Sequence, residues 1–424
     1  MNNKSQNRWL IAIMGTVLQL VLGTVYAWSF FQRPVMDAFG WSNVQVMWIF
    51  SLAIVFLGLT AALGGSILPR FGPKKLAVTG AILYAAAYFI SGFAMSINNL
   101  PLFYLGFGVI GGMGLGLGYV TPVATASKWF PDKKGLVTGM VIMGFGFGAL
   151  LMSKVIAPAM INIADGDLVK VFYYIGFILL IMGTPAAMFM VNPPADFVPA
   201  GYMPPVQSTS AAASANSMKA SSAILSGKFL AMWVIFFMNI AAGIIFIGWQ
   251  SPMLQDLLKL TNPELDMATL AAAGATLIAI SSLFNGVGRM FWGGISDKIG
   301  RIQAFRVILA SQMVVFVILM YSSSPWIFMI LVCYVLLCYG GGFGTMPAFV
   351  LDVFGAKLMP VVYGTILTAW SLAGIVGPQI AAFIKDNYPE TASFNTFVAG
   401  GTLLAIGLLV SFALNNKPLE PKQA

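Results

Sequence analysis

The sequence predicts an all-α membrane protein that crosses the bilayer twelve times. Of its 424 residues, 59% are apolar and only 8% are charged, whereas a soluble domain is about 45–50% apolar and about 25% charged. Mean hydropathy is +0.89. A membrane helix needs about 20 apolar residues, so twelve of them need about 240. The composition excludes a soluble globular protein, and it excludes a disordered one because disorder requires few apolar residues.

Twelve apolar segments recur along the chain, six on each side of a polar break. The break divides the chain into an N-terminal six-helix bundle (1–192), a linker (193–227) and a C-terminal six-helix bundle (228–424). The linker is rich in Pro, Ser and Ala, so we expect a flexible connector. The predicted spans are 9–31, 45–68, 76–97, 101–127, 135–158, 170–192, 228–254, 268–294, 303–322, 325–350, 361–384 and 391–414.

Basic residues are distributed unevenly between the loops. Sixteen of the 22 Lys and Arg residues lie on the side of the N-terminus, five lie on the other side, and Arg289 belongs to neither. The positive-inside rule therefore predicts cytoplasmic N- and C-termini. A cleaved signal peptide is the alternative for the first segment, but its apolar run of about 20 residues is too long for one.

Similar loops in the two halves predict pseudo-symmetric bundles. Gly65–Lys75 follows span 2 and Gly294–Arg301 follows span 8, and both place Gly, a basic residue, Gly and another basic residue at a tight turn. Phe130–Lys134 and Phe354–Lys357 match more loosely after spans 4 and 10. Two related six-helix halves are a transporter architecture, with the substrate near the midplane between them.

Arg289 is the only charge placed well inside a predicted span. It precedes Asp297, at the cytoplasmic end of span 8, by eight residues, or about 12 Å along a helix. An Arg at the helix centre costs about 2.5–3.5 kcal/mol on insertion scales, and 12 Å is a long way to snorkel. A guanidinium matches a carboxylate with two parallel hydrogen bonds, so we expect an anion site.

The loop from Gly293 to Arg301, with Asp297 between them, resembles the short signature of the major facilitator superfamily. The first copy departs from the signature at Pro69, where the family has Asp. This resemblance implies the two-bundle fold of that superfamily. It also implies a conformational role for Gly293, Asp297, Arg301 and the corresponding Arg70.

Finer motifs are similar to those of the oxalate/formate antiporter family and the related monocarboxylate transporters. They are Val25–Phe30, Tyr119 ten residues before Trp129–Gly135, and Asn285–Arg289 before Phe291–Gly293. The resemblance implies that Arg289 is the substrate-binding cation. Oxalate exchangers of this family add a Lys on span 11, where this chain has Trp370.

The single intramembrane cation favours a monocarboxylate, because a dianion would leave one negative charge unpaired. We therefore expect a secondary active transporter of lactate- or pyruvate-like anions, and the alternative is an oxalate/formate-type exchanger. Asn285 lies one turn before Arg289 and could contact substrate or form an ordinary interhelical hydrogen bond. Further candidate contacts, each with helix packing as the alternative, are Tyr26, Tyr119, Tyr339, Phe343, Trp370 and Ser371.

Proton coupling has no obvious intramembrane carrier. Animal monocarboxylate transporters have an acid where this chain has Asn285. Asp256, Glu264 and Asp266 lie at the outer ends of spans 7 and 8; they are candidate proton carriers, and a solvated loop is the alternative. We expect proton coupling, although exchange for a counter-anion would need no proton site.

Other roles are not expected. The chain has no His and two Cys five residues apart, and no metal motif is present. We expect no metal, no cofactor, no enzymatic activity and no nucleic-acid partner. We expect a monomer embedded in the lipid bilayer of the cell membrane, with a membrane sensor that binds the anion without moving it as a lower alternative.

Overall fold

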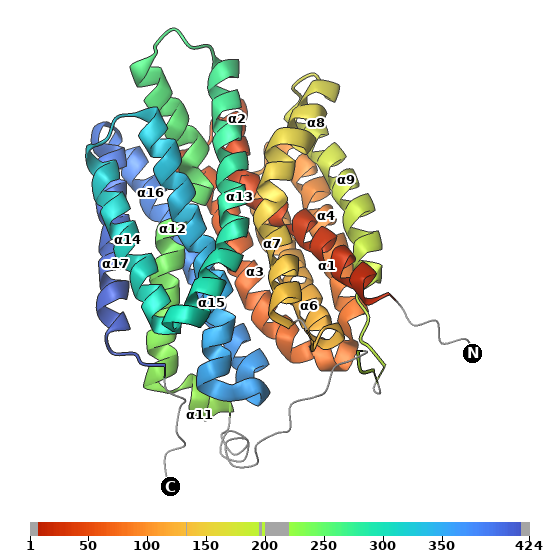
Figure 1. The fold of residues 1–424 in the computed structure, drawn as a ribbon. Helices are drawn as coiled ribbons and strands as arrows, with labels where there is room; N and C mark the ends of the chain where they lie inside the picture. Colours follow the sequence, from red (N-terminus) through yellow and green to blue (C-terminus); the bar gives the residue numbers. More distant parts are fainter. Residues whose placement is uncertain (1–6, 133, 195–196, 200–219, 417–424) are drawn as a thin grey trace.

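The computed structural model describes residues 7–132, 134–194, 197–199 and 220–416. Every regular element in these ranges is helical. Twelve helical segments are long and apolar enough to cross a membrane, which confirms the predicted all-α, twelve-span fold. Figure 1 shows the first six spans, coloured red to yellow, beside the last six, coloured green to blue.

The first six spans contain several interrupted helices. A 3₁₀ turn breaks the first span, and π-helical stretches interrupt the fourth and fifth. Their elements are α1 (Arg8–Gly23), η1 (Thr24–Ala27), α2 (Trp28–Phe39), α3 (Asn43–Phe71), α4 (Pro73–Ser96), α5 (Leu100–Phe103), η2 (Tyr104–Gly111), α6 (Gly112–Trp129), α7 (Lys134–Leu151), η3 (Met152–Ile156), α8 (Ala157–Ile163) and α9 (Leu168–Met188).

The last six spans contain longer helices. Their elements are α12 (Gly227–Thr261), α13 (Met267–Ile299), α14 (Arg301–Tyr321), α15 (Pro325–Ile366), α16 (Thr368–Asn387), η4 (Pro389–Thr391) and α17 (Ala392–Ser411). α15 covers the tenth span and the start of the eleventh, with a kink at Gly355.

Spans 1 and 7 run further than predicted, to Phe39 and Thr261 instead of 31 and 254. The added turns carry polar residues, among them Arg33 and Asp256. The hydropathy of the sequence therefore predicted the ends of these two spans too early.

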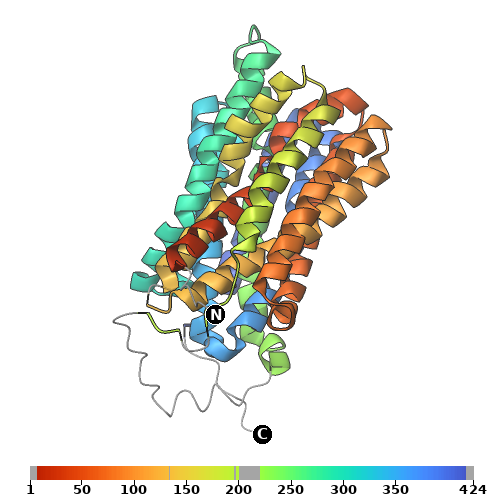
Figure 2. The ribbon, with the colours of Figure 1, turned by 90° about the vertical axis from the view of Figure 1, so that its right-hand side faces the viewer.

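The turn between α12 and α13 lies at the tip of the molecule (Figures 1 and 2). We call the face that carries this turn the distal face, and the face where α1 begins and α17 ends the terminal face.

Corresponding turns in the two halves have the same backbone form, as the loop repeat predicted. Gly72 ends α3 with φ +77°, and Gly300 ends α13 with φ +91°. Glycine adopts positive φ without the steric penalty of a Cβ. Each glycine is followed at once by the next helix, so both turns reverse the chain within one residue.

The linker is only partly described. A short helix, α11 (Ala220–Ile224), precedes α12. At the start of the linker the Phe197 ring packs edge-on against Trp129, with centroids 4.7 Å apart. The predicted flexible connector otherwise falls on residues 195–196 and 200–219, which lie outside the described residues.

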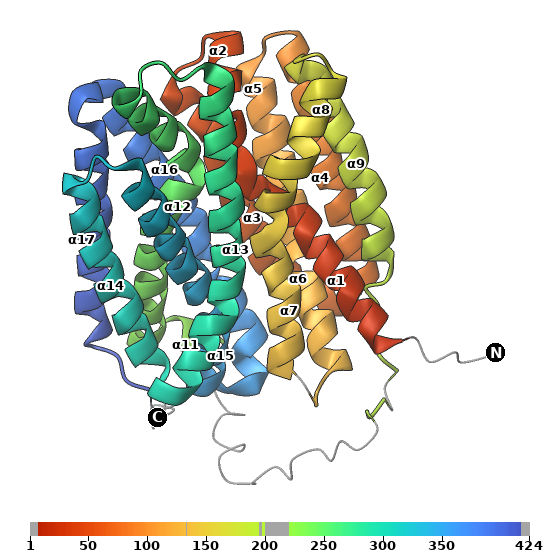
Figure 3. The same cartoon turned by 45° about the horizontal axis from the view of Figure 1, so that its top comes forward.

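Two helix pairs hold the halves together, α3 with α16 and α7 with α13. Figures 1 and 3 show α7 and α13 side by side where the two groups of helices meet. The contact at Gly146 of α7 is between backbones, because a Cβ there would lie 2.6 Å from the Cα of Gly286 in α13. The close approach therefore depends on the absence of a side chain.

We predict that Gly146→Ala lowers the melting temperature of the purified protein by several degrees. The added methyl group meets backbone, which cannot move aside as a side chain can, and overpacking costs about 1–3 kcal/mol. Gly294→Ala in α13 is the matched control, since a Cβ there has no atom within 4 Å. Equal melting temperatures for the two variants would contradict this account of the interface.

Candidate substrate-binding site

Arg289 lies on α13 between the two halves, and its side chain is 3% exposed. Its Nε, Nη1 and Nη2 atoms have no hydrogen-bond partner among the described residues. The guanidinium carbon lies 5.1 Å from the centroid of Phe343 and 5.9 Å from that of Phe145. Cation–π contacts of this kind contribute about 0.5–2 kcal/mol. They do not satisfy the five N–H donors of the guanidinium, which remain without hydrogen-bond partners among the described residues.

The two rings that contact this charge belong to a connected cluster of six rings, which we call the aromatic cage. They pack edge-to-face or tilted, with neighbouring centroids between 4.7 Å for Phe343–Trp370 and 6.3 Å for Tyr26–Trp370. The cage consists of Tyr26 of η1, Tyr119 of α6 and Phe145 of α7 from the first half, and Tyr339 and Phe343 of α15 and Trp370 of α16 from the second. Both halves therefore enclose the same cation.

One hydrogen bond inside the cage joins the halves. The hydroxyls of Tyr26 and Tyr339 lie 2.7 Å apart. The 3₁₀ turn η1 places Tyr26 at the break between α1 and α2. Because a buried phenol requires a polar partner, this pair stabilises the contact between the halves at the cage.

Other polar groups around the cage lack partners within the described part of the chain. The donors are the hydroxyls of Tyr119 and Tyr363 and Nε1 of Trp370, and Oδ1 of Asn285 is an acceptor. The Tyr363 hydroxyl lies near Tyr119 and Arg289, although it makes no hydrogen bond to either among the described residues. Buried polar groups without partners are rare and call for an explanation. A small ligand with a carboxylate and one further oxygen would supply partners for them.

The structure brings together most of the predicted substrate contacts. Arg289, Tyr26, Tyr119, Tyr339, Phe343 and Trp370 meet in the cage, and Asn285 borders a cavity of about 10 Å³ beside Tyr26. Ser371 is different, since its hydroxyl donates to the carbonyl of Val55 at 2.9 Å across the two halves. It holds α16 to α3 instead of offering a free group.

Two neighbours of Arg289 were missed by the sequence analysis. Phe145 lies between Gly144 and Gly146, and small residues of this kind are typical of close helix packing. Tyr363 lies in a predicted span without any neighbouring residue that indicates a position near Arg289. Aromatic residues that recur on the inner faces of several spans were the available signal for both.

The three candidate proton carriers occupy different settings on the distal face. Asp256 of α12 pairs with both Arg33 and Lys385, whereas Glu264 is exposed in the following loop. Asp266 caps α13 by accepting from the backbone N–H of Thr269 at 2.8 Å. Hydrogen bonds from the side chain and backbone of Thr269 lower the pKa of Asp266, which keeps this carboxylate ionised at neutral pH.

The loop-signature residues differ between the halves. Arg301 pairs with Asp297 at 2.5 Å and with Asp352 at 2.9 Å, which joins α14 to α13 and α15. Gly293 lies on α13 one turn before Asp297. Arg70 is exposed and lies over the Phe71 ring at 5.5 Å. The conformational role of all four residues stays a prediction.

Two groups of six spans that meet around a buried cation have the architecture typical of polytopic membrane transporters. The Major Facilitator Superfamily matches residues 10–378. The protein therefore belongs to this superfamily and is a multi-pass membrane protein.

Known proteins of similar sequence include carriers of small carboxylates. The oxalate:formate antiporter of Oxalobacter formigenes is 27% identical over 96% of this chain and 90% of its own. Apicoplast pyruvate carrier 1 of Toxoplasma gondii is 27% identical over 84% of this chain and 71% of its own. These similarities confirm the resemblance drawn from the motifs.

Solved structures agree on the fold. A D-xylose-proton symporter superposes with a TM-score of 0.72 over 98% of both chains, at 16% sequence identity. At that identity the likeness concerns the fold alone.

We predict that Tyr119→Phe and Tyr363→Phe each weaken binding of pyruvate, used as the probe anion, about 10- to 100-fold. A hydrogen bond to a charged group contributes about 1.5–3 kcal/mol, and 1.4 kcal/mol is tenfold in affinity. Calorimetry on the purified protein would measure the affinity for pyruvate. Tyr334→Phe is the matched control, because the Tyr334 hydroxyl already donates to Ser311 at 2.7 Å. Unchanged affinity in both site variants would remove these hydroxyls from the site.

Proposed function

We propose that the protein is a secondary active transporter of small monocarboxylates such as lactate and pyruvate. In this proposal the carboxylate binds to Arg289, and the two halves rock around it to expose the site to each side in turn. One observation carries the proposal: the guanidinium is buried and unpaired inside a cage built by both halves. A carboxylate is the anion that best matches its planar fork.

The charge of the site favours a monoanion. One guanidinium and one carboxylate about 4 Å apart gain about 4 kcal/mol at an effective dielectric of 20. A second carboxylate of the same substrate would need a second cation. Trp370 lies where the exchangers of oxalate have Lys, and its ring packs 4.7 Å from Phe343. That part of the cage suits the methyl group of lactate or pyruvate.

The unpaired polar groups favour a second oxygen next to the carboxylate. Asn285 Oδ1 could accept from the hydroxyl of a 2-hydroxy acid. The Tyr119 and Tyr363 hydroxyls could donate to the carboxylate, and Trp370 Nε1 could donate to a 2-oxo group. This donor and acceptor count supports lactate and pyruvate over acetate or formate.

A second candidate function is exchange of oxalate for formate. The similarity to a protein named for that exchange, over 96% of this chain, favours it. The single cation argues for a monoanion instead. The similarity to a protein named as a pyruvate carrier agrees with the monocarboxylate proposal.

We place the terminal face in the cytoplasm of a cell-membrane protein, because the loops on that face carry most of the Lys and Arg residues. The rocking units in this proposal are residues 1–192 and 228–424, connected by the linker 193–227, in a monomer. Uptake is proposed to be coupled to protons, with Asp256 as the candidate carrier because it contacts both halves. The proposed role of Asp297, Arg301, Gly293 and Arg70 is to stabilise one conformation at the terminal face.

We predict that Arg289→Ala abolishes pyruvate uptake into proteoliposomes and that Arg289→Lys lowers it at least tenfold. Lysine keeps the charge but loses the bidentate geometry. Arg306→Lys is the matched control, since Arg306 contacts Ser411 and Phe412 near the terminal face. Uptake that persists in a well-expressed Arg289→Ala protein would exclude Arg289 as the binding cation.

We predict that an inward proton gradient stimulates lactate uptake into proteoliposomes and that external oxalate competes poorly. The gradient tests coupling, and the competition tests the charge argument for a monoanion. Uptake that ignores the gradient and requires an internal counter-anion would instead establish exchange. Strong competition by oxalate would favour the oxalate/formate function.

A further inference from the structure

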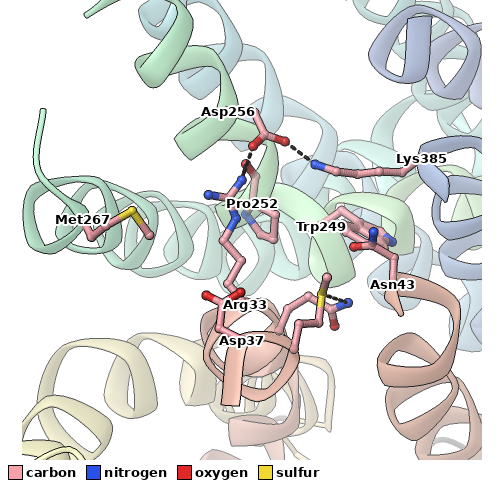
Figure 4. Close-up of a pocket in the computed structure, with 10 residues that line it drawn as sticks. Arg33, Asp37, Asn43, Trp249, Pro252, Asp256, Met267 and Lys385 are labelled. Carbon is pink, nitrogen blue, oxygen red and sulfur yellow. Dashed lines mark hydrogen bonds and ion pairs between the residues drawn. The ribbon is translucent and has the colours of Figure 1, made fainter. Parts of the chain in front are cut away.

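A second set of cations lies apart from Arg289, in a cavity of about 290 Å³ that opens on the distal face between the two halves. We call this cavity the vestibule. Figure 4 shows its residues, with Arg33 and Lys385 pointing at the two oxygens of one carboxylate, Asp256. The vestibule is lined by Gln32, Arg33, Met36, Asp37, Asn43, Trp249, Pro252, Asp256, Met267 and Lys385.

The contacts of the vestibule join the two halves. Arg33 of α2 donates to Asp256 of α12, to the Pro252 carbonyl at 3.2 Å and to Gln255 at 3.2 Å. Lys385 of α16 reaches the other oxygen of Asp256 and lies 5.9 Å from the centroid of Trp249. The contacts of Arg33 must break when the distal side opens, because α2 belongs to the first half, whereas Lys385 and Asp256 both belong to the second.

Every partner in this cluster remains accessible to water. The side chains of Arg33, Lys385 and Asp256 are 24%, 29% and 44% exposed. An anion from solution can therefore reach both cations. Arg289 differs, because it is 3% exposed and has no carboxylate of the chain bound to it among the described residues.

We propose that Arg33 and Lys385 form an entry site for the substrate carboxylate, which Asp256 occupies while the distal side is closed. This inference rests on the proposed function and adds a second anion site to it. The arriving carboxylate replaces Asp256 between the cations, so the substrate itself separates α12 from α2. It then moves on to Arg289, which has no carboxylate of its own to exchange.

The other charges around Asp256 fit this exchange. Asp37 lies one turn after Arg33 on α2 and lines the same cavity, so it can take over Arg33 when the halves separate. Asp386 is held elsewhere, by the side-chain amide of Asn43 at 2.7 Å and the N–H of Val44 at 3.2 Å. Lys259, one turn after Asp256 on α12, donates to the carbonyls of Pro263 and Leu265.

The same geometry links proton and anion. A proton on Asp256 would cancel the charge that holds both cations, just as substrate does by competition. Proton binding and external anion binding would then favour each other by linkage. Asp256→Asn should reproduce the protonated state at every pH.

The test compares variants that break the same ion pair between the halves but change the charge in opposite directions. We expect Asp256→Asn to lower the external KM for pyruvate at least threefold. Arg33→Gln, which removes a cation of the entry site, should raise that KM at least threefold. Lys170→Gln is the matched control, because Lys170 is a distal-face lysine on α9 that pairs with Asp167.

A purely mechanical contact predicts a different result. If the cluster only holds the halves closed, Asp256→Asn and Arg33→Gln remove the same ion pair between α2 and α12 and should shift the external KM in the same direction. Shifts of equal sign would therefore overturn the entry site.

Binding to an Arg289→Ala protein separates this inference from the proposed function. Residual pyruvate binding, measured by saturation-transfer NMR, should be strengthened by Asp256→Asn and lost with Lys385→Gln. That readout does not depend on transport, so it tests the vestibule even if Arg289 proves unnecessary for uptake. Residual binding that ignores both vestibule variants would overturn the entry site and leave the Arg289 proposal standing.

Discussion

The Arg289 guanidinium lies in the interior of the bundle without a counter-ion among the described residues, and the surrounding structure is arranged around that charge. A charged side chain in a low-dielectric interior is costly unless it is paired. Here the compensation consists of two ring faces, those of Phe343 and Phe145. Such contacts are weaker than a charged hydrogen bond, so a site of this kind gains most from an anion that brings its own carboxylate. In the proposed mechanism the unpaired charge is therefore available to substrate.

The way the cage is divided between the halves connects that charge to movement. Tyr26, Tyr119 and Phe145 come from the first six spans, and Tyr339, Phe343 and Trp370 come from the last six. An anion enclosed by both groups can leave only when the groups separate. Contacts that resist separation extend from the cage to the distal face, from the Tyr26–Tyr339 hydrogen bond to the pairing of Arg33 with Asp256. This distribution describes a state in which the distal side is closed.

Much of this could be predicted from the sequence, for identifiable physical reasons. Membrane spans follow from apolar runs, because a spanning helix in lipid must be apolar over about 20 residues. Arg289 was visible because a charge within such a run is rare. Phe145 and Tyr363 were not, since apolar or aromatic residues suit the core, the lipid and the cage equally well. The partners of Asp256 were also hidden, because Arg33 is 223 residues away in the sequence and only the packing of α2 against α12 brings them together.

Arg33 and Lys385 are paired with a carboxylate of the chain, whereas Arg289 has no such partner among the described residues, and this difference has a physical cause. Arg33 and Lys385 are open to water, and the Asp256 carboxylate between them ties α2 to α12 through Arg33, which stabilises the closed state when no substrate is present. A carboxylate of the chain bound to Arg289 would instead hinder substrate binding. Substrate would have to displace it in a dry cavity, and the displaced acid would be left buried without a partner, at a penalty of several kcal/mol. An acid is therefore tolerable at the entrance, where water can solvate it after exchange, and unfavourable at the centre. This chain has an amide, Asn285, one turn from Arg289, which is consistent with that constraint.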